Sequence, residues 1–123
     1  MRFVAAFIVQ AMTAESLTLE SVPGQAPGSR ILRLTGPLTL SSLFDFQTVL
    51  RTDPPALLIL DLTAVPYMDS AGMGAIINYF VSCQRHGNKM VVAGVNGRVM
   101  ELFKMTKVDS LLTLVPTVAE AEA

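Results

Sequence analysis

The stretch ALLILDLTAVPYMDSAGMG, residues 56–74, decides the fold because two structural patterns meet within it. Its first part is an apolar run closed by Asp61, which is typical of a parallel strand covered on both faces. From Ala71 onward the apolar residues instead recur at helical spacing. Ser70 therefore lies where a buried strand has ended and a helix begins, close to amides that have no partner within the helix.

Hydrophobic periodicity on either side of this stretch predicts strands that alternate with helices. Strands are expected at 17–22, 31–34, 56–62, 89–93 and 111–115. Helices are expected from Ser41 or Ser42 to about Arg51, from 71 to about 85, after a cap at Asn96, and as a short stub after Thr117. The first two strands form a hairpin, and the later helical crossovers make parallel strands. The predicted class is α/β: a single domain with a small mixed sheet and about four helices.

Capping patterns mark several of these helix ends. Ser42 with Asp45 resembles a capping box, and so does Thr117 with Glu120. Gly87 suits the left-handed residue that often closes a helix. These positions set the expected helix boundaries.

The composition excludes several classes of protein. A chain of 123 residues with 51% hydrophobic residues and a mean hydropathy of +0.50 has enough apolar side chains for one packed core. A net charge of −1 without a basic run argues against nucleic-acid binding. The single cysteine, Cys83, excludes an internal disulfide and suits a reducing compartment. With one histidine and one cysteine, neither a structural zinc site nor another metal or cofactor is expected. The apolar runs are shorter than the ~20 residues that span a bilayer, so no membrane insertion is expected.

Residues 1–11 are more apolar than an ordinary domain start. A signal peptide is disfavoured because the apolar part is short and the basic part is a single arginine. Two interpretations stay open: an extra edge strand, or an extension from an upstream start site, with the domain itself covering 12–123. An apolar strand at a sheet edge invites pairing with another chain, so a homodimer is a prediction.

Four stretches, in this order along the chain, resemble a STAS domain, specifically a stand-alone anti-sigma factor antagonist. They are 30–39, 58–63 running into 68–75, 87–95 and 99–106. The D-S-A-G match alone is not specific, whereas the succession of all the stretches is. The fold of that family, a small mixed sheet with helices, agrees with the element order expected above.

The resemblance implies a function and a site. Ser70 would be the phosphoacceptor, phosphorylated by a partner anti-sigma factor that is itself a serine kinase. The unphosphorylated protein would bind that kinase and release the sigma factor, and a PP2C-type phosphatase would reset it. Such a protein is a cytoplasmic signalling component and not an enzyme. The expected partner-binding residues surround the serine: Met68, Asp69, Ala71, Gly72, Met73 and Gly74.

The residue types suit that chemistry. A helix start tolerates an anion, so a phosphate on Ser70 need not unfold the chain. It adds about −1.5 to −2 charges beside Asp69, and a partner groove that accepts a hydroxyl would reject this dianion. Gly72 and Gly74 would let a partner's backbone approach, and Met68 or Met73 would supply an apolar contact.

Each of these residues also has an ordinary structural interpretation. Ser70 could serve only as the helix N-cap, and Asp69 only as a partner of the helix dipole. Met73 lies in the apolar stripe of the helix, which favours the core, and Cys83 suits a small buried apolar residue.

Three alternative functions compete with that of an antagonist. A hydrolase with Ser70 as nucleophile fails because the only histidine, His86, is sixteen residues along the same helix, about 24 Å away. A receiver domain would use Asp61 and needs an acidic pair after its first strand, which the chain lacks. A non-switching STAS subunit of a transporter or lipid-trafficking complex would not depend on Ser70 phosphorylation, and it remains the second interpretation.

Overall fold

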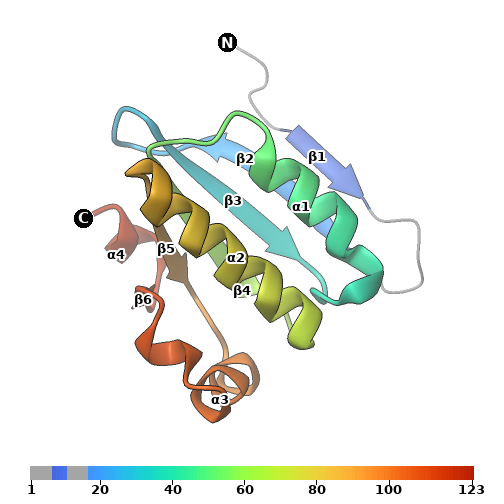
Figure 1. Cartoon of the computed structure of the whole chain (residues 1–123). Helices are drawn as coiled ribbons and strands as arrows, with labels where there is room; N and C mark the ends of the chain where they lie inside the picture. The colour runs from blue at the N-terminus through green and yellow to red at the C-terminus, as the bar shows by residue number, and fades with distance from the viewer. Residues whose placement is uncertain (1–6, 11–16) are drawn as a thin grey trace.

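The computed structural model describes residues 7–10 and 17–123, which form one mixed six-stranded sheet with helices packed on it (Figure 1). The strands lie in chain order across the sheet: β1 (Phe7–Gln10), β2 (Thr18–Pro23), β3 (Ser29–Thr35), β4 (Leu57–Ala64), β5 (Lys89–Ala93) and β6 (Leu114–Val115). The α-helices of this part of the chain are α1 (Leu43–Arg51), α2 (Ser70–His86), α3 (Gly97–Met105) and α4 (Val118–Ala121). Strands β1 to β3 pair antiparallel and β3 to β6 pair parallel. The predicted α/β class, initial hairpin and parallel crossovers are confirmed.

Strand β1 lies at the edge of the sheet and pairs with β2, with Phe7 opposite Ser21 and Gln10 opposite Thr18. The boundary expected between residues 11 and 12 falls outside the described residues. The role of the whole 1–11 segment, and the homodimer inferred from it, stay predictions.

Strand β4 is central, with β3 and β5 as its neighbours. Leu58, Leu60 and Leu62 point to the face that carries α1, α2 and α3, where they join a core with Phe46 and Phe103. Each leucine buried there contributes about 1.5–3 kcal/mol. Ile59 points to the opposite face, which α4 covers in part with Val118 and Ala121. Covering on both sides explains why this strand is an unbroken apolar run.

Local structure differs from the sequence prediction at two places. The predicted Ser42–Asp45 capping box is wrong, because a 3₁₀ turn at Leu40–Ser42 precedes α1 and Ser42 Oγ accepts from Thr39 N at 3.1 Å. The predicted strand at 111–115 is reduced to Leu114–Val115, since a second 3₁₀ turn at Val108–Ser110 leads the chain into the sheet later.

The caps predicted at Gly87 and Asn96 are confirmed, and of the predicted Thr117–Glu120 capping box the structure shows the bond to the Thr117 side chain. Gly87 closes α2 in the left-handed conformation, with φ of 71°. Asn96 caps α3, and the Thr117 side chain accepts from Glu120 N at the start of α4. Within the described ranges, no helix is long and apolar enough to cross a membrane.

Candidate functional site

The candidate site lies at the carboxyl edge of the parallel strands. Strands β3, β4 and β5 all run toward this edge, and each then passes through a loop into a helix. Figure 1 shows the first turns of α1 and α2 side by side at this end of the sheet. Functional sites of open α/β sheets gather at such an edge because loops and helix N-termini converge there.

Asp69 is the N-cap of α2. Its Oδ1 accepts from Gly72 N at 2.9 Å, which satisfies one of the amides that the first helical turn leaves without a partner. Ser70 is the first helical residue, and it is exposed. The interpretation of Ser70 as the N-cap is therefore wrong, because the aspartate before it occupies that position.

The Asp69 carboxylate also bonds to a distant loop. Its Oδ2 accepts from Leu40 N at 3.0 Å, from the 3₁₀ turn that leads into α1. Backbone bonds reinforce this link: Asp69 N donates to Leu38 O and Leu38 N donates to Tyr67 O, each at 3.2 Å. Asp69 is thus more than a partner of the helix dipole, since it joins the loop before α2 to the loop before α1.

Asn96, the N-cap of α3, joins the loop before α2 to the loop before α3. Asn96 Oδ1 accepts from Val99 N at 2.8 Å, while Nδ2 donates to the carbonyls of Val65 and Pro66 at 3.1 Å each. The guanidinium of Arg98 lies 4.9 Å from the centre of the Tyr67 ring. The chain that leads to Ser70 is therefore held from both sides.

Gly72 is buried, and its lack of a side chain lets the start of α2 pack closely against Leu38 in the loop before α1. A Cβ there would clash with the Leu38 carbonyl oxygen and lie 2.9 Å from Leu38 Cγ. Gly74, one turn after Ser70, is exposed and faces open space. Of the two glycines expected to admit a partner's backbone, Gly74 alone leaves room for one.

Met68 and Met73 are both buried in the main core, and Ala71 is half-buried. Met73 Sδ accepts a hydrogen bond from Thr106 Oγ1 at 3.3 Å. The core interpretation of Met73 is confirmed. Neither methionine side chain is exposed for the apolar partner contact that the sequence predicted.

Two exposed apolar side chains that sequence reasoning missed lie beside this loop. Leu40 is 71% exposed and Phe44 is 75% exposed. The sequence does carry a signal for them: the two apolar residues are four positions apart and lie outside the apolar face formed by Leu43, Phe46 and Leu50, so the core of the helix does not account for them.

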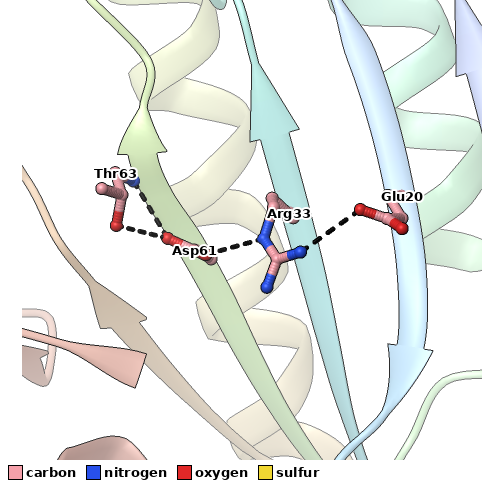
Figure 2. A network of polar contacts seen from close by, with 4 residues as sticks. All are labelled: Glu20, Arg33, Asp61 and Thr63. Atoms are coloured by element: carbon pink, nitrogen blue, oxygen red, sulfur yellow. Dashed lines mark hydrogen bonds and ion pairs between the residues drawn. The ribbon is translucent and has the colours of Figure 1, made fainter. Parts of the chain in front are cut away.

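Asp61 belongs to a different polar cluster, on the sheet face opposite the leucine core (Figure 2). Its Oδ1 accepts from Thr63 N at 3.0 Å and Thr63 Oγ1 at 2.6 Å, and its Oδ2 accepts from Arg33 Nε at 3.1 Å. Arg33 Nη1 also donates to Glu20 at 3.3 Å. Burial raises the pKa of the Asp61 carboxyl, but the bonds from Thr63 and Arg33 outweigh it and leave the pKa below its usual value. A carboxylate that is 5% exposed with both oxygens occupied is a structural group, which counts against a receiver-type phosphoacceptor.

The remaining candidate residues lie far along α2. Cys83 is buried and burial raises the pKa of its thiol, as expected for a small apolar residue. Burial also raises the pKa of the neighbouring Tyr79 to about 12. His86 is the last residue of α2 and Ser70 the first, so they stand at opposite ends of a 17-residue helix.

Comparison with known proteins agrees with this architecture. The model of the STAS domain matches residues 21–121. The chain is 33% identical over 55 residues to an anti-sigma-B factor antagonist of Listeria monocytogenes, covering 45% of this chain and 48% of that one. It therefore spans about half the length of that relative.

Two solved structures share the fold. An anti-sigma factor antagonist from Mycobacterium paratuberculosis superposes with a TM-score of 0.77 at 18% identity, covering 89% of this chain and 93% of that one. A sulfate transporter family protein from Wolinella succinogenes gives 0.67 at 22% identity, covering 79% and 84%. With a family match across most of its length, the chain belongs to the STAS domain family.

Proposed function

We propose that this protein is an anti-sigma factor antagonist controlled by phosphorylation of Ser70. The observation that carries the proposal is the position of Ser70: exposed, first in α2, and preceded by a loop that is bonded to both neighbouring loops. A kinase needs a hydroxyl that is accessible and held in place. The similarity to the Listeria anti-sigma-B factor antagonist supports the antagonist part of the proposal.

The local chemistry allows the phosphate to be added without unfolding the helix. Because Asp69 is the cap, the Ser70 hydroxyl is not needed to hold the first turn together. The positive end of the helix dipole tolerates the added charge. The phosphate also places about two negative charges beside the Asp69 carboxylate, which changes the surface that a partner meets.

The proposed cycle involves four proteins: this chain, the anti-sigma factor kinase, the sigma factor and a phosphatase. The unphosphorylated chain binds a cytoplasmic anti-sigma factor that is a serine kinase, and the sigma factor is released. The kinase then transfers the γ-phosphoryl group of ATP to the Ser70 oxygen, which loses its proton, and ADP leaves. A PP2C-type phosphatase hydrolyses the ester and restores binding.

The test uses the anti-sigma factor kinases of the host, purified one at a time and incubated with this protein and ATP. Intact mass measurement with peptide mapping should find one added phosphoryl group on Ser70 with one of them. The Ser70→Ala variant should stay unmodified while still binding that kinase. Phosphorylation at another residue, or none with any host kinase, would contradict the proposal.

A second candidate function is a non-switching STAS subunit of a transporter complex. The similarity in fold to the Wolinella sulfate transporter family protein favours it. Protein purified from the host under growth and stress, with phosphatase inhibitors present, would then carry no phosphate on Ser70. It would copurify with a membrane protein instead of an anti-sigma factor.

A further inference from the structure

We propose that Leu40 and Phe44 form the apolar part of the surface that binds the anti-sigma factor, and that Asp69 is the positioning residue that joins this surface to Ser70. The inference rests on the proposed function. It adds the contact residues and a mechanism by which a phosphate on Ser70 changes their position.

The first argument is exposure. Leu40 and Phe44 are 71% and 75% exposed, and they lie one helical turn apart where the 3₁₀ turn runs into α1. Their spacing of four residues across the junction of the 3₁₀ turn and α1 puts two exposed apolar side chains about one turn apart, and we call the two together the Leu40–Phe44 patch. Neighbouring exposed apolar side chains are typical of interaction surfaces. No charged side chain lies between Leu38 and Phe44.

The second argument is continuity with the phosphorylation site. Leu40 N donates to Asp69 Oδ2 at 3.0 Å, and Asp69 directly precedes Ser70. The Asp69 carboxylate thus holds Leu40 with one oxygen and the first turn of α2 with the other. A partner that contacts the Ser70 hydroxyl meets the Leu40–Phe44 patch beside it. That partner needs an apolar pocket for the patch and a polar group for the hydroxyl.

The third argument concerns charge. A phosphate on Ser70 is a dianion next to the Asp69 carboxylate, and it is attracted to the same first-turn amides that the carboxylate caps. Repulsion and competition for Gly72 N both move the carboxylate away from its present position. Leu40 N then loses its acceptor, and the patch loses its fixed position relative to α2. The phosphate would act on the apolar contact as well as at its own position.

Amide hydrogen exchange tests this route without any partner. The protein is made with phosphoserine at position 70, with unmodified serine, and as Asp69→Ala. We expect exchange of the Leu40 amide to rise at least about tenfold with phosphoserine and in Asp69→Ala. The Val99 amide, which Asn96 holds in the same way in α3, is the internal control and should not change. Equal Leu40 exchange in the phosphorylated and unmodified proteins would overturn the route.

Binding tests the contact residues. Leu40→Ser and Phe44→Ser are compared with Leu111→Ser, a matched control that is 46% exposed in the 3₁₀ region before β6. The probe is the host anti-sigma factor kinase that phosphorylates Ser70, and calorimetry measures the dissociation constant. Because both residues are exposed, the variants should keep the unfolding midpoint of the wild type. We expect Leu40→Ser and Phe44→Ser to weaken binding at least about tenfold, and Leu111→Ser to leave it within about twofold.

The outcomes separate this inference from the proposed function. If wild type binds the kinase and Leu40→Ser and Phe44→Ser bind equally well, the contact assignment is wrong and the proposed function stands. If no host anti-sigma factor kinase binds the wild type, both are wrong.

Discussion

Asp61 and Asp69 lie on either side of the same strand-to-helix connection, yet their surroundings differ in kind. Asp61 is 5% exposed and bonds to an arginine and a threonine from the sheet, whereas Asp69 is half-buried and bonds to two backbone amides. The first carboxylate bonds to Arg33 of β3 and to Thr63 of its own strand, and both of its oxygens are occupied. The second links two loops and leaves the hydroxyl next to it exposed. A charged group that stabilises a fold and one that prepares a site can therefore be told apart by what they bond.

Removing the buried Asp61 carboxylate should give the largest effect and tests this comparison most directly. Asp61→Ala leaves Arg33 and Thr63 without their acceptor, and we expect the free energy of unfolding to fall by about 3 kcal/mol in urea denaturation. The control is Asp53→Asn, because Asp53 is 84% exposed and its 3.7 Å ion pair with Arg30 lies at the surface. That change should stay within about 0.5 kcal/mol. If both variants lost the same unfolding free energy, the Asp61 network would stabilise the fold no more than an exposed ion pair does.

The close contact between Gly72 and Leu38 predicts the next largest effect on stability. Gly72→Ala forces a methyl group against the Leu38 carbonyl, and we expect a loss of about 2 kcal/mol as the two loops separate. Gly74→Ala places the same methyl group in open space in the same helix, and it should be neutral or stabilise by up to about 1 kcal/mol. Thermal or urea unfolding measures both. Similar stabilities for the two variants would show that the Gly72–Leu38 contact is not tight.

The cap assignment predicts a smaller difference between neighbouring residues. Asp69→Ala removes the acceptor of two amides and should cost about 1–2 kcal/mol of unfolding free energy. Ser70→Ala removes a side chain that caps nothing, so it should change stability by less than about 0.5 kcal/mol. A larger cost for Ser70→Ala than for Asp69→Ala would reverse the assignment.

The pH dependence of stability gives the smallest effect. Because the Asp61 pKa is lowered in the folded state, the ionised carboxylate stabilises the protein above the pKa of the unfolded chain, about 3.9. That contribution is lost as pH falls through the folded pKa. The difference in unfolding free energy between wild type and Asp61→Asn should therefore shrink between about pH 5 and pH 3. A difference that stays constant over this range would contradict the lowered pKa.

Local pattern was enough for much of the fold. The apolar run of β4, the helical stripe of α2 and the caps at Gly87, Asn96 and Thr117 were all predictable. Each depends on residues that are close in the chain, where periodicity and capping chemistry act. The start of the last strand was not predictable, because the 3₁₀ turn before it buries Val108 and Leu112 in a core built from distant elements.

The sequence by itself determined that a serine follows an aspartate at the start of a helix behind a buried strand. It could not determine which of the two caps the helix, because aspartate and serine are about equally good N-caps. The amide of Leu40, 29 positions earlier in the chain, lies beside Asp69 and gives its carboxylate a second donor. Tertiary contacts also buried Met68, Gly72 and Met73 and left Leu40 and Phe44 exposed. These outcomes depend on how distant loops pack against one another, and local propensity carries no information about that packing.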